Sequence, residues 1–126
     1  MKRITMILAA AALALAVSAP AVLAKGGDGT RIALKSAKAF PAAKGAATFK
    51  AKPGERELEA EVEHVRRLAG KTVTFYVAGK KLGSAKVGAL GAAHITRRNS
   101  AVPIVRPGTV VRVKTAGGVL IVRGSF

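Results

Sequence analysis

The sequence contains no cysteine and no tryptophan, and only six of its 126 residues are aspartate or glutamate. The lack of cysteine excludes disulfide bonds, thiol chemistry, a lipidated N-terminal cysteine and metal sites built from thiolates. Both methionines, Met1 and Met6, lie near the N-terminus, so the rest of the chain has no sulfur. The fold must therefore depend on an apolar core without covalent cross-links.

Histidine and aspartate are also rare, which limits the available catalytic chemistry. The histidines are His64 and His94, and the single aspartate, Asp28, lies in a glycine-rich segment. A hydrolytic triad requires a nucleophile, a base and an orienting acid, and the Gly-x-Ser-x-Gly motif is absent. The two histidines do not have the short spacing of metal ligands on one element. We expect no catalytic residue, no metal site and no cofactor.

The first 24 residues have the three-part pattern of a cleavable signal peptide. Lys2 and Arg3 precede an apolar run over residues 4–17, which is shorter than the roughly 20 residues that a membrane span needs. Ala24 ends a Val-Leu-Ala sequence that suits a signal peptidase. We expect export to the periplasm or the extracellular space, with no integral membrane segment after cleavage. An uncleaved anchor over residues 4–24 is the alternative.

Basic residues dominate the charge of the chain. Lysine and arginine number 22, which gives a formal net charge of +16 at pH 7. Such a charge attracts polyanions, including nucleic acid, acidic glycans and anionic lipid. The alternative is that the charge only keeps an exported protein soluble. Five of the six acidic residues fall within nine positions: Glu55, Glu57, Glu59, Glu61 and Glu63.

Glycine and proline divide the chain from residue 45 onward into short runs rich in β-branched residues. The strongest strand signal is Thr-Val-Thr-Phe-Tyr-Val over residues 72–77. Strands between such turns are typical of an all-β sandwich or barrel. Residues 25–44 are expected to form a flexible or loosely ordered lead-in to a β-sandwich domain over residues 45–126, with a strand in the lead-in as the alternative. Further strands are expected over residues 47–51, 82–87, 92–96, 109–114 and 119–123.

Alternation within the last expected hairpin predicts which side chains face water. Val111 and Val113 can face a core, which leaves Arg112 and Lys114 on the open surface.

Residues 57–64 fit two structures. Their strict alternation of glutamate with other residues predicts a strand, with Leu58, Ala60 and Val62 facing inward. The spacing of Leu58, Val62 and Val65 also fits a helix over about residues 55–69, and helix propensity favours it. We favour the strand because every neighbouring segment is predicted to be β. A helix would make the fold α+β.

Two groups of motifs resemble known bacterial domains. Gly-Lys-Thr-Val-Thr-Phe-Tyr-Val over residues 70–77, followed by Gly79 and by Leu-Gly-Ser-Ala-Lys-Val over residues 82–87, resembles bacterial immunoglobulin-like repeats of the Big type. The ending, with Pro107-Gly108 and Gly-Ser-Phe over residues 124–126, is similar to small exported bacterial β-domains without assigned function. The resemblance implies a small immunoglobulin-like β-sandwich. Its motifs mark turns and core strands, so it implies no activity.

The sequence therefore predicts an exported, non-catalytic binding or structural module. A polyanion or an envelope protein would be its partner. A purely structural domain that contacts another protein through a sheet edge is the alternative, and a weak metal-binding or enzymatic role is a third. We expect anion contacts from basic residues that turns and loops expose: Lys80, Lys81, Arg97 and Arg98.

Overall fold

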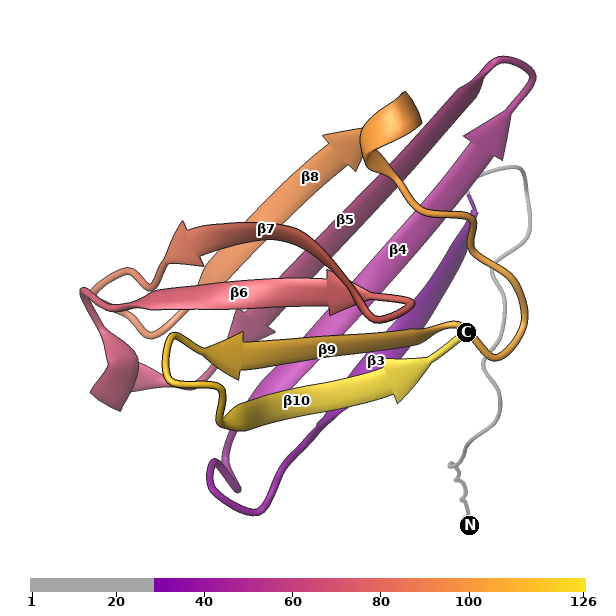
Figure 1. The fold of residues 1–126 in the computed structure, drawn as a ribbon. Coiled ribbons are helices and arrows are strands. Elements are labelled where there is room, and N and C mark those ends of the chain that lie inside the picture. Colours follow the sequence, from indigo (N-terminus) through magenta and orange to yellow (C-terminus); the bar gives the residue numbers. More distant parts are fainter. Residues whose placement is uncertain (1–28) are drawn as a thin grey trace, which may run out of the picture.

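The computed structural model describes residues 29–126, which form one antiparallel sheet of eight strands (Figure 1). The strand order across the sheet is β7-β6-β9-β10-β3-β4-β5-β8. The expected all-β fold is confirmed, whereas the expected signal peptide over residues 1–24 lies outside the described residues. The strands are β3 (Thr30–Ser36), β4 (Lys44–Lys52), β5 (Glu55–Glu63), β6 (Thr72–Val77), β7 (Lys80–Lys86), β8 (Ala93–Arg98), β9 (Val110–Thr115) and β10 (Leu120–Ser125).

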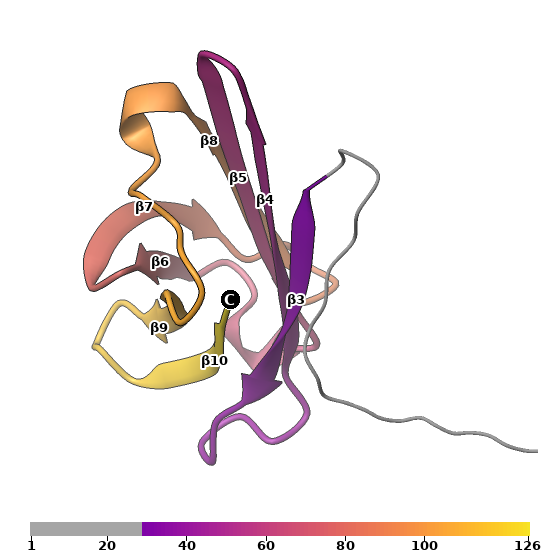
Figure 2. The same cartoon turned by 90° about the vertical axis from the view of Figure 1, so that its right-hand side faces the viewer.

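The sheet bends sharply between β10 and β3. Only two residue pairs, Val122 with Ser36 and Arg123 with Lys35, join these strands. We call β7, β6, β9 and β10 the front half, and β3, β4, β5 and β8 the back half. The front half lies across the back half, so that one surface of each faces the other (Figures 1 and 2).

Apolar side chains fill the space between the two halves. They come from alternate positions of the strands, because successive residues of a strand point to opposite surfaces. Among the described residues, none that is polar or charged belongs to the fully buried set. The largest completely buried side chains include Phe75, Leu58, Ile121, Val62, Val73 and Val113. This core holds both halves together, and no charged residue of positions 29–126 is fully buried in it.

The segment over residues 57–64 is a strand, and the helical alternative is wrong. In β5, Leu58, Ala60 and Val62 are buried. The strand lies between β4 and β8 and pairs with both, and this pairing overrides the helix propensity of the glutamates. His64, with a φ of 63°, ends the strand. A three-residue 3₁₀ turn, η1 (Arg66–Leu68), follows it.

The sheet begins at Thr30, within the segment that was expected to be a loosely ordered lead-in. Strand β3 pairs with β4 on one side and with β10 on the other. Its Ile32 and Leu34 are buried in the common core. A local alanine- and lysine-rich sequence gives little sign of this strand, because its stability comes from pairing with the distant C-terminal strand. The expected domain boundary at residue 45 is therefore corrected to about residue 30.

Candidate functional site

All the carboxylate side chains of residues 29–126 lie on β5. They occupy the odd-numbered positions of the strand, between the buried Leu58, Ala60 and Val62. They therefore form one column on the outer surface of the back half. The column consists of Glu55, Glu57, Glu59, Glu61 and Glu63.

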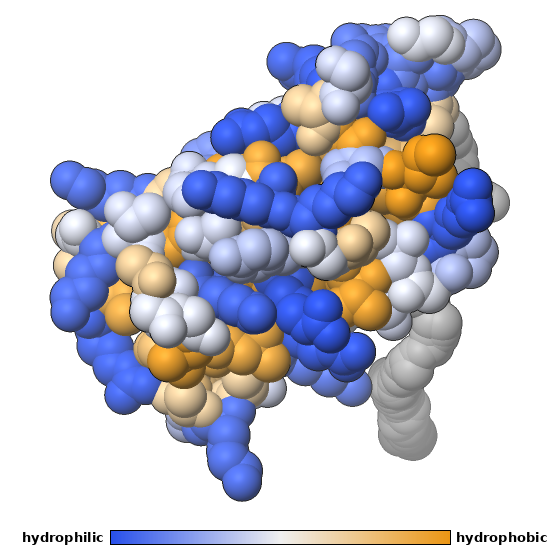
Figure 3. All heavy atoms as spheres, viewed as in Figure 1, coloured by the Kyte–Doolittle hydropathy of each residue, from blue (hydrophilic) through white to orange (hydrophobic). Residues whose placement is uncertain are grey.

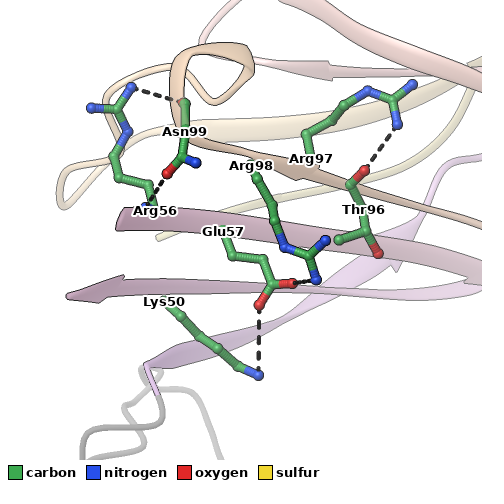
Figure 4. A network of polar contacts seen from close by, with 7 residues as sticks. All are labelled: Lys50, Arg56, Glu57, Thr96, Arg97, Arg98 and Asn99. Carbon is green, nitrogen blue, oxygen red and sulfur yellow. Dashed lines mark hydrogen bonds and ion pairs between the residues drawn. The ribbon is translucent and has the colours of Figure 1, made fainter. Parts of the chain in front are cut away.

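Cations from β3, β4 and β8 pair with this column. Arg98 Nη2 lies 2.8 Å from Glu57 Oε2, and Lys50 Nζ lies 4.0 Å from Glu57 Oε1 (Figure 4). Farther along the strand, Arg31 Nη2 lies 3.4 Å from Glu61 Oε2. Each exposed pair adds little stability. Together, however, the pairs balance much of the positive charge on the outer surface of the back half.

The outer surface of the front half carries cations without carboxylates. One row crosses its strands: Tyr76 on β6 lies opposite Lys81 on β7 and Arg112 on β9, and Arg112 lies opposite Arg123 on β10. Directly opposed side chains in antiparallel strands are close neighbours. Figure 3 shows hydrophilic side chains extending over this surface. We call the following set the basic face: Tyr76, Lys81, Lys86, Arg112, Lys114 and Arg123.

Short contacts organise the centre of the basic face. Lys114 Nζ lies 5.2 Å from the centroid of the Tyr76 ring, so a cation–π interaction holds the ammonium group over the ring. Beside them, Thr74 Oγ1 and Ser84 Oγ are 3.1 Å apart. Within residues 29–126, none of the basic-face cations forms an ion pair. The face therefore presents unpaired hydrogen-bond donors, which suit phosphate, sulfate or carboxylate groups.

The structure places only part of the predicted anion site on this face. Lys80 and Lys81 were expected in a turn, but they begin β7. The reason is that Ala78 and Gly79 have φ values of 54° and 78°, as in the tight two-residue turns of β-hairpins. Lys81 belongs to the basic face, and Lys80 is exposed beside it.

Arg97 and Arg98 were expected in a loop, but they lie in β8. Arg98 is paired with Glu57 on the back half. Arg97 points to the other surface. Its Nη1 donates to the carbonyl oxygen of Thr96 at 2.9 Å (Figure 4), and its Nε donates to that of Leu82 at 3.2 Å. These two arginines therefore already have partners, and they project from opposite surfaces of β8.

Sequence reasoning missed most of the basic face. The alternation over residues 109–114 correctly indicated that Arg112 and Lys114 avoid the core, and both lie in the middle of the face. What the sequence did not reveal is that β6 pairs with β9, which brings Tyr76 next to Arg112. Nor did it reveal that all the paired glutamates lie on the opposite side of the molecule.

Two depressions lie away from the basic face. One of 210 Å³, on the outer surface of the back half, is lined by residues that include Glu59, His94 and Thr96. The other, of 500 Å³, lies beside the β4–β5 turn, where Arg56 Nη2 donates to the carbonyl oxygens of Asn99 and Val102. Over residues 29–126, no group of three or more acidic or histidine side chains is arranged to hold a metal ion.

Comparison with models of known protein families found no match, and comparison with curated proteins found none either. Within the part of the chain that the structure describes, no helix is long and apolar enough to cross a membrane. What the protein does must therefore be inferred from the arrangement of its side chains.

Proposed function

We propose that the protein is an exported, non-catalytic module that binds anionic partners through the basic face. The observation that carries this proposal is the separation of charge. The glutamates of the described residues are confined to β5 on the back half, while the cations of the basic face form no ion pair with any of them. A surface that only prevented aggregation would not need its carboxylates confined to one side.

The chemistry of the basic face supports an anionic partner. Arginine forms two parallel hydrogen bonds to phosphate or carboxylate groups, and lysine adds a mobile point charge. Arg112 is half-buried between β6 and β10, so less side-chain freedom is lost when it binds. The export of the module and its immunoglobulin-like character remain part of the proposal, and they rest on the sequence motifs.

Salt-dependent binding tests this function. The measurement is the affinity of residues 25–126, which include every strand of the sheet, for a heparin-like glycan and for duplex DNA over a salt series. A variant with Lys81, Arg112, Lys114 and Arg123 changed to glutamine removes all the cations of the basic face except Lys86. If each of the four contacts one phosphate of duplex DNA, the slope of log K against log salt falls by about 3 to 4.

A matched variant separates the face from net charge alone. Changing Lys44, Lys50, Lys52 and Arg98 to glutamine removes the same charge from the back half, and it should change the slope much less. Equal losses in the two variants would show that only total charge matters. If the unaltered protein binds neither polymer at physiological salt, the proposal is wrong, and the search moves to protein partners at the sheet edges.

A further inference from the structure

Two turns of the front half lie at the same end of the molecule. Strand β7 ends where β6 begins, since Lys86 pairs with Thr72, and β6 begins where β9 ends, since Val73 pairs with Thr115. The β7–β8 turn over residues 87–92 and the β9–β10 turn over residues 116–119 therefore project from one end (Figure 1). We call this the turn end.

Both of these turns expose an aliphatic side chain. Leu90 is 77% exposed, and Val119 is 47% exposed. Their neighbours are mostly alanine and glycine, so no larger side chain of the same turn covers them. Ile104, the remaining large and exposed aliphatic residue of the described part, lies in the segment that leads into β9, at the opposite end of that strand.

Lysines flank both aliphatic tips. Lys86 ends β7 four residues before Leu90, and Lys114 pairs with Leu120, the residue after Val119. Lys71 lies beside the β7–β8 turn, because its carbonyl oxygen accepts the Val87 N–H at 2.8 Å. Cations around an exposed aliphatic tip fit the boundary between lipid headgroups and acyl chains.

The rings of Tyr76 and Phe40 do not favour single-stranded nucleic acid as the partner. Sequence-independent binding of single strands depends on free aromatic ring faces that stack on bases. Lys114 covers the Tyr76 ring, and Arg67 lies 4.3 Å from the centroid of the buried Phe40 ring. Neither ring presents a stacking platform, whereas contacts to phosphate groups need none.

We infer that the anionic partner is a phospholipid surface, which the molecule meets with its turn end. Leu90 and Val119 enter the headgroup boundary, while Lys71 and Lys86 contact the phosphate groups. This inference rests on the proposed anion-binding function, because Lys86 also belongs to the basic face. It adds an apolar contribution that salt does not screen.

Vesicle binding by two serine variants tests the inference. The probes are vesicles of phosphatidylcholine and phosphatidylglycerol in equal amounts, with pure phosphatidylcholine and the heparin-like glycan as separate arms. The protein is again residues 25–126, because an attached signal sequence would itself bind lipid. The double variant Leu90→Ser and Val119→Ser should bind the anionic vesicles about tenfold or more weakly, since two aliphatic side chains lose their apolar contact. Its affinity for the glycan should not change.

Ile104→Ser is the matched control, because it removes an aliphatic residue whose exposure lies between those of Leu90 and Val119 from the opposite end. This variant should bind the vesicles as the unaltered protein does. Thermal melting establishes that all variants are folded. Unchanged vesicle binding by the double variant would overturn the lipid inference and leave the anion-binding proposal intact. If the unaltered protein preferred duplex DNA over vesicles at physiological salt, the lipid inference would also be overturned, and the anion-binding proposal would again stay intact. Absence of binding to every anionic probe would overturn both.

Discussion

Gly124 is a single residue at which β10 comes very close to β3, beside the bend of the sheet. It lies in β10, next to Arg123, which pairs with β3. A Cβ atom at this position would lie 2.6 Å from the Ala33 carbonyl oxygen and 2.8 Å from Leu34 Cδ2. Both contacts are too close, and one is with backbone, so β3 would have to move away. We expect Gly124→Ala to lower the free energy of unfolding by about 1–3 kcal/mol, as measured by urea denaturation.

Gly117→Ala is the control for that substitution. The nearest atom to a Cβ at Gly117 is Thr115 Oγ1, at 3.8 Å, and the residue does not have a positive φ. Alanine also restricts the unfolded chain more than glycine does. Stability should therefore stay the same or rise slightly. Equal losses in the two variants would show that close packing against β3 is not the reason for glycine at position 124.

At the scale of elements, the two terminal strands of the sheet lie side by side without a backbone ladder between them. Within the described residues, β7 pairs only with β6, and β8 pairs only with β5. Arg97 of β8 bridges the gap by donating to the Leu82 carbonyl oxygen of β7. One side chain thus replaces part of the pairing that would close the sheet into a barrel.

Removing this bridge should loosen both terminal strands. Arg97→Met keeps much of the aliphatic stem but loses the donors, and we expect it to lower the free energy of unfolding by about 1–2 kcal/mol. Amide exchange in β7 and β8 should also become faster. Arg98→Met is the control: it removes the same charge, but it breaks only an exposed ion pair, which should cost less than about 1 kcal/mol. Similar exchange in the two variants would contradict the bridging role.

Elements with strong local alternation were predictable from the sequence. The strand over residues 72–77 matches β6, and the alternation of glutamates correctly favoured β5 over a helix. A strand at the position of β3 was only the alternative to a loosely ordered lead-in, because its stability depends on long-range pairing with β4 and β10. The prediction that Arg97 and Arg98 lie in a loop was wrong for a related reason. Their contacts depend on which strands lie beside β8, and the local sequence does not show this.

The candidate site was less predictable than the strands. Alternation shows that Arg112 and Lys114 avoid the core, but it does not show which strand lies next to β9. The row from Lys81 through Tyr76 to Arg123 requires the order β7-β6-β9-β10, in which β6 and β9 are more than 30 residues apart in the sequence. Arg97 and Arg98 were predicted to act together, but they project from opposite surfaces of β8.

At the scale of the whole molecule, the two outer surfaces differ in electrostatic character. The basic face has unpaired cations, while Arg31, Lys50 and Arg98 on the back half are paired with glutamates of β5. Under the proposed function, the protein would approach an anionic surface with the front half, because the carboxylates of residues 29–126 all lie on β5 of the back half. The glutamate column would then confine binding to one side.

Neutralising the column should make the protein bind anions on both sides. In the triple variant Glu57→Gln, Glu59→Gln and Glu61→Gln, the cations of the back half lose their partners and can contact a second anionic surface. We expect this variant to link vesicles that contain phosphatidylglycerol, whereas the unaltered protein should bind them without linking them. A rise in the turbidity of the vesicle suspension measures the linking.

The control must gain the same charge on the front half alone. Thr72, Ser84 and Ser125 are exposed there, and changing all three to lysine adds three positive charges without altering the glutamates. This variant should bind the vesicles more tightly and still not link them, because the back half keeps its ion pairs. If it raised turbidity as much as the glutamine variant, net charge would be the cause. If neither variant raised turbidity, the cations of the back half would be unable to bind a second surface. The glutamate column would then not be the reason why binding is confined to one side.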